Sequence, residues 1–347
     1  MIPTLVAATP GPQFVIVAAV VIGCLVPFTY RSWHKETHDL MQKLAEQGTE
    51  SPRDHDDECI TAAALKRRME NLPKVVQQYL ESTLSLTLHN TTHETDDDEK
   101  IIPFARALRV EQEGKFLLNE QWIPFTATQE FSARRTHPGF VWDAVMKKPC
   151  FPLPGSLTIP ILVRDAYIPG IGGIMKAQLP LGITLVNMKD TPDLNLGEVM
   201  RWIAESTLFP MVLVPQVHEC DEAPVLKWSP GADTNANSAR LEFKHKGYLA
   251  QVDFYFDPHT HMVTTIHAKR PRTVGSKTEM THWEGHFSDY EIHGGLLVPS
   301  KMEVGWKFSD DSPLELYFRG KNVKFIYLMN AGSRQEHSSR EIHPHME

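Results

Sequence analysis

Hydrophobic and polar residues alternate with a period of two over most of the chain after residue 104. The clearest stretches are residues 240–246, 250–256 and 301–308, where the side chains of one face are mainly apolar. Such alternation predicts strands with one apolar face, and the short polar segments between them are typical of hairpin loops. The pattern predicts a large curved antiparallel β-sheet, a half-barrel-like meander around a core or a cavity.

Two segments follow the helical period instead. Residues 63–83 carry apolar side chains three and four positions apart, and Pro73 divides the segment into two helices or kinks a single one. Residues 195–210 show the same spacing up to Pro210. The expected fold class is therefore α+β, with a few helices covering the sheet.

The N-terminus has a different character. Residues 1–30 contain no charged side chain, and residues 14–30 form an almost unbroken apolar run. A membrane span needs about 17–25 such residues, and a cleaved signal would carry basic residues before the run. We expect a retained N-terminal transmembrane helix, with a cleaved signal or a buried core helix as alternatives.

The membrane side of the domain stays open at this stage. The basic residues Arg31, Lys35 and Lys43 follow the span and favour a cytoplasmic domain. Asn90 begins an N-T-T glycosylation motif, which matters only on a lumenal side. The expectation is a single-pass membrane protein of undecided orientation.

The rest of the chain divides by composition. We expect a polar linker over residues 31–62 and one α+β domain over residues 63–330. Within that domain, residues 89–100 are acidic and poor in apolar side chains, so a disordered loop is expected there. Residues 331–347 are expected to form a disordered tail.

Charge and cysteine content exclude some functions. The formal net charge is −8 and no long basic run offsets it, which argues against a nucleic-acid partner. The four cysteines are far apart and form no C-x-x-C, so neither a disulfide framework nor a zinc site is expected. His282 and His286 are interpreted as surface residues of a polar strand face. We therefore expect no metal and no cofactor.

The candidate site begins in residues 163–183, VRDAYIPGIGGIMKAQLPLGI. Its glycines fit no dinucleotide fingerprint, because Met175 occupies the third glycine position, and no P-loop follows. Arg164 and Asp165 are neighbours on a predicted strand, so they point to opposite faces. A charge on the apolar face needs a partner or a polar ligand group. The alternatives are strand-end charges in water and a buried turn of the core.

Arg201 and Glu205 lie four residues apart on one face of the predicted helix. This order is the weaker one for helix stabilisation, so the pair is either a solvated ion pair or part of a site. Trp202 beside them needs cover. The residues expected to line a ligand site are Arg164, Asp165, Tyr167, Met175, Leu179, Arg201, Trp202, Glu205 and Trp306.

Several stretches of the chain resemble a mainly bacterial family known only as a domain of unknown function. The resemblance covers about residues 70–328 and is carried by residues 72–80, 121–144, 163–173, 197–210 and 282–306. The architecture is similar to that of LolA-type lipoprotein-sorting carriers, in which a curved antiparallel sheet holds acyl chains under helices. The resemblance implies a fold but supplies no activity.

Two main functions are consistent with these patterns. The first is a membrane-tethered carrier whose apolar groove takes a lipid or another amphiphile, because two helices are too few to cover faces such as Phe254 and Trp306. Arg164 or Arg201 would then meet an anionic headgroup. The second is an enzyme that uses Asp165, Arg201 and Glu205 for acid–base and electrostatic catalysis. A non-catalytic interaction protein is the remaining alternative.

Overall fold

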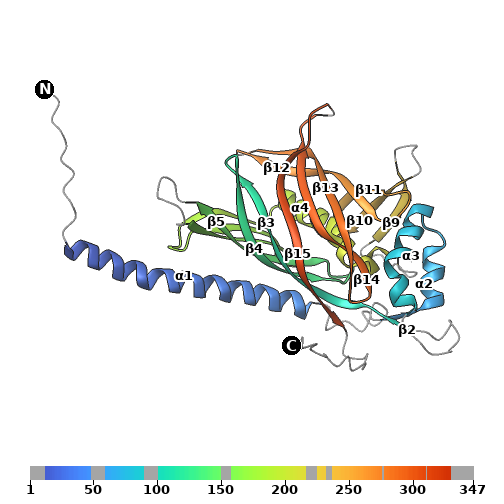
Figure 1. Ribbon diagram of the computed structural model, residues 1–347, viewed down its shortest axis with the longest axis horizontal. Coiled ribbons are helices and arrows are strands. Elements are labelled where there is room, and N and C mark those ends of the chain that lie inside the picture. Colours follow the sequence, from blue (N-terminus) through green and yellow to red (C-terminus); the bar gives the residue numbers. More distant parts are fainter. Residues whose placement is uncertain are drawn as a thin grey trace, which may run out of the picture.

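The computed structural model describes residues 12–47, 59–89, 101–149, 158–215, 225–231, 237–275, 277–309 and 311–329. Its main feature is one antiparallel sheet of 13 strands, curved around a helix (Figure 1). This confirms the α+β class and the large antiparallel sheet expected from the sequence. The acidic loop beyond residue 89 and the tail from residue 331 lie outside the described residues.

The strands of this sheet, in chain order, are β3 (Ala105–Leu118), β4 (Gln121–Ser132), β5 (Gly139–Pro149), β6 (Thr158–Ile168), β7 (Gly172–Gln178), β8 (Thr184–Lys189), β9 (Val225–Pro230), β10 (Ser238–His245), β11 (Tyr248–Phe256), β12 (Val263–Val274), β13 (Lys277–His293), β14 (Leu296–Lys307) and β15 (Glu315–Met329). A separate pair joins β1 (Cys59–Thr61) to β2 (Ile101–Pro103). The helices are α1 (Pro12–Glu46), α2 (Ala62–Met69), α3 (Lys74–His89) and α4 (Pro192–Glu205). Two 3-10 turns, η2 (Ser206–Leu208) and η3 (Pro210–Leu213), follow α4.

The strand order shows two meanders that meet at the centre of the sheet. Strands β3 to β8 run outward to one edge, and β9 to β15 return from the other edge until β15 pairs with β3. Helix α4 connects the two halves and contacts β5, β6 and β7 of one half and β11 and β12 of the other. The helix therefore lies on the concave side of the sheet, between its two edges.

Period-two alternation places the core on this concave face. In β4, for example, Ile123, Phe125 and Phe131 are buried, whereas Pro124, Thr126 and Thr128 on the other face are more exposed. The face of β11 is also covered: Phe254 is fully buried, and Phe256 packs 5.7 Å from the ring of Tyr79 on α3. The expected open groove over residues 250–256 is therefore wrong, because α3 and Trp228 on β9 cover these side chains.

Helix α1 extends well past residue 30, where the sequence predicted a polar linker. Trp33, Thr37, Leu40 and Leu44 recur at helical spacing and form a buried stripe. This stripe packs on the convex face of β5, β6 and β7, whereas the N-terminal half of α1 projects away from the domain (Figure 1). Within the described residues, no helix combines the length and the apolar character needed to cross a membrane.

The other helices lie close to their predicted positions. Pro73 separates α2 from α3, as its ring and missing N–H require. Helix α4 begins after Thr191, whose side chain accepts a hydrogen bond from the backbone N–H of Leu194, and it ends at Glu205 rather than at Pro210. The two 3-10 turns occupy the remaining residues and complete the cover of the core.

Candidate functional site

Helix α4 is buried on nearly all sides, including its polar face. Glu198, Arg201 and Glu205 are three and four residues apart and lie on this face. Because the helix passes along the inside of the curved sheet, the polar side chains meet strand residues rather than water. This arrangement creates a charged cluster within an otherwise apolar interior.

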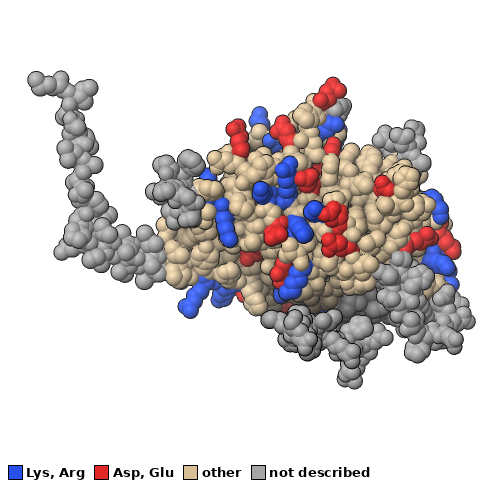
Figure 2. All heavy atoms as spheres, viewed as in Figure 1, with Lys and Arg blue, Asp and Glu red and all other residues tan. Residues whose placement is uncertain are grey.

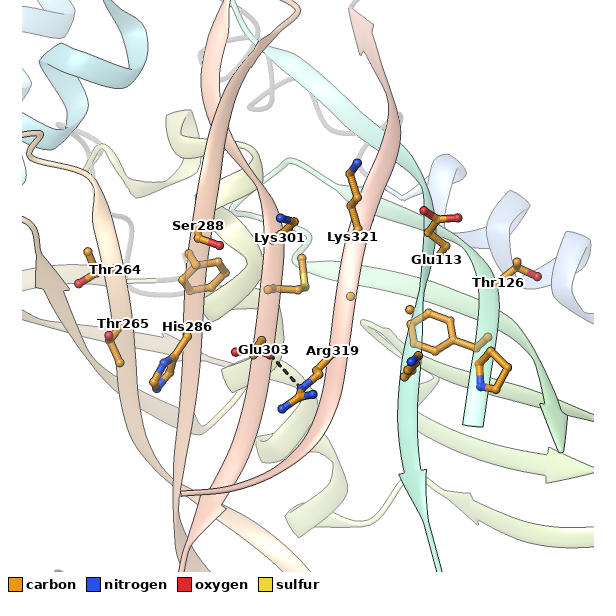
Figure 3. Close-up of a pocket in the computed structure, with 17 residues that line it drawn as sticks. Glu113, Thr126, Thr264, Thr265, His286, Ser288, Lys301, Glu303, Arg319 and Lys321 are labelled. Carbon is orange, nitrogen blue, oxygen red and sulfur yellow. Dashed lines mark ion pairs between the residues drawn. The ribbon is translucent and has the colours of Figure 1, made fainter. Parts of the chain in front are cut away.

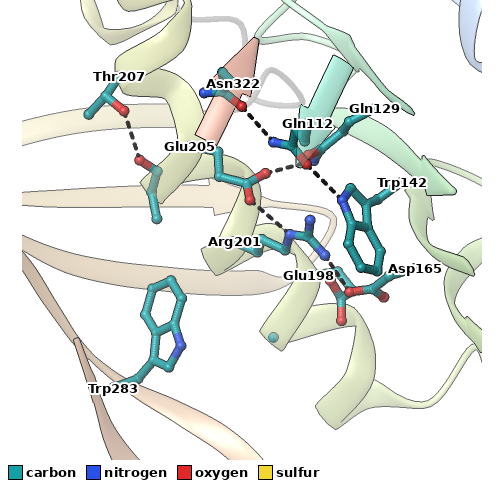
Figure 4. A network of polar contacts seen from close by, with 12 residues as sticks. Gln112, Gln129, Trp142, Asp165, Glu198, Arg201, Glu205, Thr207, Trp283 and Asn322 are labelled. Atoms are coloured by element: carbon teal, nitrogen blue, oxygen red, sulfur yellow. Dashed lines mark hydrogen bonds and ion pairs between the residues drawn. The ribbon is translucent and has the colours of Figure 1, made fainter. Parts of the chain in front are cut away.

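Arg201 is the centre of this cluster (Figure 4). Its Nη1 lies 2.5 Å from Oδ2 of Asp165 on β6, and its Nε donates to Oε1 of Glu205 at 3.1 Å. The side chains of Arg201, Asp165 and Glu205 are only 14%, 7% and 13% exposed. The guanidinium also lies 4.6 Å from the ring centre of Phe140. The solvated-pair alternative is therefore excluded.

The electrostatics of Arg201 follow from these neighbours. Burial acts to lower the pKa of the guanidinium, but Glu205, Asp165 and Glu198 outweigh burial and raise the pKa above its usual value. Arg201 is permanently charged, and two carboxylates already compensate it. Arg201 therefore has no uncompensated positive charge with which to bind the anionic headgroup expected from the sequence.

Glu198 behaves differently from the other two acids. It is 2% exposed, and burial followed by the charge of Asp165 raises the pKa of its carboxyl group to about 8. Nη2 of Arg270 on β12 lies 3.4 Å from Oε1 of Glu198, and its Nε donates to the backbone carbonyl of Gly197 at 3.0 Å. The raised pKa favours the protonated carboxyl group, which can donate as well as accept a hydrogen bond.

Side-chain amides extend the cluster across the central strands. Nε2 of Gln129 donates to Oε2 of Glu205 at 2.8 Å. Nε2 of Gln112 donates to Oδ1 of Asn322, and the indole N–H of Trp142 donates to Oε1 of Gln112, both at 2.8 Å. We call these residues the central polar cluster: Gln112, Gln129, Trp142, Asp165, Glu198, Arg201, Glu205, Arg270 and Asn322.

Four buried polar atoms of the central polar cluster have no hydrogen-bond partner among the described residues. They are Oε1 of Gln129, Oδ1 of Asp165, Oε2 of Glu198 and Nδ2 of Asn322. A buried polar group left unpaired costs about 1–3 kcal/mol, so four in one place call for a partner. Water molecules or the polar end of a ligand are the chemical species that can supply it.

An aromatic surface adjoins the cluster. Phe116, Trp306 and Tyr317 are half-buried on the concave face, with the Tyr317 ring 5.7 Å from Phe116 and 5.8 Å from Trp306. A bulge at Val304 and Gly305 changes the register of β14 against β15. The indole N–H of Trp283 donates to the Tyr317 hydroxyl at 2.9 Å, and Arg270 lies over the Trp283 ring. We call Phe116, Trp283, Trp306 and Tyr317 the aromatic wall.

The outer face of the sheet carries a separate hollow of about 1040 Å³ over β3, β4 and β12 to β15 (Figure 3). Its charged lining consists of Glu113, Lys115, Lys301, Glu303, Arg319 and Lys321. Glu303 and Arg319 form an ion pair at 2.9 Å, and Figure 2 shows basic and acidic side chains intermixed on this face. None of the residues predicted to bind a ligand lines this hollow.

The structure brings together three of the predicted site residues, Asp165, Arg201 and Glu205. Trp306 lies on the aromatic wall, and Met175 pairs with Asp165 across β6 and β7 on the same face. Trp202 is fully buried and donates its indole N–H to the Ser132 carbonyl, so its position is structural. Tyr167 packs against His245, and Leu179 against the main core at the end of β7.

Arg164 does not belong to this group. As the alternation predicts, it points to the opposite face from Asp165, where it contacts α1. Nη1 lies 2.9 Å from Oε2 of Glu36, Nη2 donates to the Trp33 carbonyl at 2.7 Å, and the guanidinium lies 4.0 Å from the Trp33 ring centre. The expected ligand contact of Arg164 is therefore corrected to a contact that holds α1 on the sheet.

The sequence interpretation missed Gln129, Glu198, Arg270 and Asn322. A signal was present for Gln129, because it occupies the buried phase of the β4 alternation after Ile123, Phe125 and Ala127. A polar residue at such a position needs a partner. Glu198 stands three residues before Arg201 on the same helix face and could have been found from that spacing.

Comparison with solved structures returns partial likenesses at low sequence identity. A DUF1329 family protein from Desulfovibrio piger is 12% identical, with a TM-score of 0.34, over 66% of this chain and 88% of its own. A putative outer membrane lipoprotein-sorting protein domain from Vibrio parahaemolyticus is 7% identical (TM-score 0.33; 66% and 87%). A LolA superfamily protein from Nitrosomonas europaea is also 7% identical (TM-score 0.30; 78% and 94%).

Comparison at the level of sequence identifies the family of the chain. No curated protein matches the chain. Residues 70–326 match the sequence profile of DUF6920, a family of unknown function, which agrees with the resemblance over about residues 70–328. The match spans most of the chain, and the protein is therefore a member of the DUF6920 family.

Proposed function

We propose that the protein is a membrane-tethered binding protein that holds one amphiphilic molecule on the concave face of its sheet. The polar end of the ligand contacts the central polar cluster, and its apolar part lies along the aromatic wall. The observation that carries this proposal is the group of four unpartnered buried polar atoms next to half-buried aromatic rings. A site of this kind combines a mainly apolar lining with a few directed polar groups.

The charges of the cluster favour an uncharged polar end. Asp165 and Glu205 compensate Arg201, and an anionic group would approach these carboxylates as closely as the guanidinium. Three of the four unpartnered atoms are oxygens, and two of them can only accept a hydrogen bond. A headgroup rich in hydroxyl, amine or amide donors satisfies them better than a phosphate or a carboxylate.

The membrane tether rests on the N-terminal residues. The uncharged run up to residue 30 has the composition of a membrane segment, and α1 continues from it into the folded domain. The half of α1 that carries the buried stripe packs on the sheet, so the domain is held directly at the end of that segment. Such a tether keeps the concave face close to a source of amphiphiles.

Native mass spectrometry of the full chain, purified in a mild detergent, tests the ligand. We expect one additional mass per chain, which solvent extraction identifies as an amphiphile without a net negative headgroup. Gln129→Leu and Asn322→Leu should each reduce its occupancy at least several-fold, because each removes hydrogen-bonding atoms that face the site. Gln251→Leu, at an exposed glutamine on β11, is the matched control and should retain the ligand.

Two results would contradict the binding proposal. One is a chain that purifies empty and takes up no fluorescent amphiphile. The other is a ligand whose occupancy is the same in Gln129→Leu, Asn322→Leu and Gln251→Leu. Unchanged thermal unfolding in the two cluster variants excludes misfolding as the reason for any loss.

A second candidate function is catalysis in the same cluster. The raised pKa of Glu198 beside Asp165 is the observation that favours it, because an acid and a base side by side can exchange protons with a substrate. Incubation of the loaded protein followed by extraction distinguishes the two functions. Catalysis predicts a converted amphiphile that Glu198→Gln leaves bound and unconverted, whereas a carrier returns it unchanged.

A further inference from the structure

One end of the domain exposes a cluster of large apolar side chains. Of the fifteen exposed large hydrophobic residues in the described part of the chain, seven belong to α1, the start of β6 and the β7–β8 hairpin. Phe28 and Ile183 are the most open of these, at 70% and 53% exposure. We call the seven residues the apolar edge: Leu25, Phe28, Ile159, Leu181, Ile183, Leu185 and Val186.

The packing of α1 on the sheet places the residues of the apolar edge at one end of the sheet, next to the β7–β8 turn. Leu40 and Leu44 pack beside Ile168 at the far end of β6, and the Trp33 indole donates to Oδ1 of Asp143 at 2.6 Å further along. Oγ1 of Thr29 lies 3.9 Å from the point where a Cβ of Gly182 would stand. The helix therefore runs from β6 toward the β7–β8 turn in the direction of its N-terminus. Leu25 and Phe28, which precede Thr29 on the helix, lie beside Leu181 and Ile183 where α1 extends beyond the domain.

The charges around the apolar edge have one sign. Residues 25–32, 144–149, 158–163 and 177–188 contain no aspartate or glutamate, although the whole chain is acidic. Arg31 and Lys147 are exposed there, and Lys148 is half-exposed. An apolar surface bordered by basic side chains matches a bilayer with an anionic surface, where phosphates lie directly above the acyl region.

We propose that the apolar edge rests in the interface of an anionic lipid bilayer. The uncharged run up to residue 30 leads into this end of the domain through α1, so the tether and the edge meet the membrane together. A second copy of the chain fits less well, because a symmetric contact would bring Lys147 and Lys148 against their own counterparts. The proposal goes beyond ligand binding and depends on none of the residues of the central polar cluster.

Site-specific fluorescence on the full chain tests this contact. The four native cysteines are replaced by serine, and an environment-sensitive fluorophore is attached at Ile183→Cys or, as the control, at Ile292→Cys. Ile292 is 60% exposed and lies near the end of β13, at the opposite end of the sheet from the β7–β8 turn. In vesicles of equal parts phosphatidylcholine and phosphatidylglycerol, position 183 should show a blue-shifted emission that brominated lipid quenches, and position 292 should show neither.

A second variant tests the contribution of the basic residues to membrane contact. Lys147→Glu with Lys148→Glu should reduce the blue shift at position 183 at least twofold, while the tether keeps the protein in the vesicles. An unshifted emission at position 183, or equal quenching at 183 and 292, overturns the proposal. In detergent without lipid, a blue shift that grows with protein concentration while the detergent concentration is held constant overturns it in favour of a second copy.

Discussion

Glu198 is a carboxyl group that the fold removes from water, and one of its oxygens has no hydrogen-bond partner in the part of the chain that the structure describes. The pKa of this group is raised to about 8, against a usual value near 4.5. Between these two pH values the folded chain keeps the proton and the unfolded chain releases it. Unfolding therefore releases a proton in this window, and this contribution to stability falls as pH rises from about 4.5 to about 8.

Glu198→Gln tests this linkage because an amide does not titrate. Relative to the wild type, the variant should gain stability steadily as pH rises through the window and stop gaining above about 8. Urea unfolding at a series of pH values measures the difference between the two proteins. Glu279→Gln, at an exposed glutamate of β13 that pairs with Arg272, is the control for replacing a glutamate by an amide on the surface of the sheet.

The cluster around Arg201 is costly for the fold. Buried ion pairs rarely stabilise a protein more than well-packed apolar side chains of the same volume, because both charges lose their hydration. Here Asp165 and Glu198 also keep unpartnered oxygens. Ligand binding therefore explains this set of buried polar residues better than folding alone does.

At the scale of elements, the period-two patterns identified the sheet well, and the helical periods located α2, α3 and α4. Side-chain partners were harder to predict, because they depend on which strands become neighbours. Gln112 meets Asn322 only because β15 pairs with β3, across more than 200 residues of sequence. Likewise, the polar face of α4 looks solvated in sequence and becomes buried because two meanders enclose the helix.

Helix α1 shows a different limit of sequence interpretation. The buried side chains Trp33, Leu40 and Leu44 follow the apolar run within one continuous helix, so the composition change near residue 30 suggested a boundary that the helix does not have. The signal for docking was the recurrence of Trp33, Thr37, Leu40 and Leu44 at threes and fours. The sequence also indicated that Arg164, a charged residue within a strand, needs a polar partner. The structure shows that α1, rather than a ligand, supplies this partner.

Trp33 should therefore be a main anchor of α1 on the sheet. Its ring packs against Arg164, and its N–H donates to Asp143, a carboxyl whose pKa burial raises. Trp33→Ala should lower the free energy of unfolding by about 3–5 kcal/mol, as for other buried aromatic side chains. Hydrogen exchange should also become faster in residues 29–46, while Lys35→Ala on the exposed face of α1 changes neither measurement. Unchanged exchange in Trp33→Ala would show that other contacts hold the helix.

At the scale of the whole molecule, the two proposed contacts are on separate surfaces. The central polar cluster lies where the two meanders meet around α4, on the concave face, and the apolar edge lies at the end of β6 to β8 where α1 leaves the domain. Helix α1 packs on the convex face, opposite Asp165. Membrane contact and ligand binding can therefore occur together, because neither occupies the surface of the other.

Two truncations separate the roles of α1. Deleting residues 1–24 removes the apolar run up to Cys24 but keeps Trp33, Thr37, Leu40 and Leu44, so the domain should fold with nearly unchanged stability. This shorter chain should leave the membrane fraction after an alkaline carbonate wash, yet still bind anionic vesicles weakly and in a salt-sensitive manner through the apolar edge.

Deleting residues 1–46 removes the buried stripe as well. It exposes Val141, Ala166 and Ile168 and leaves Arg164 without its contacts on α1, so the midpoint of urea unfolding should fall markedly below that of the shorter deletion. Retention of the chain that lacks residues 1–24 in washed membranes would contradict the single tether. Equal unfolding midpoints for the two deletions would show that α1 is dispensable for the fold. A lower midpoint for the longer deletion, together with release of the shorter-deleted chain from washed membranes, would make the same helix both a tether and a structural element of the domain.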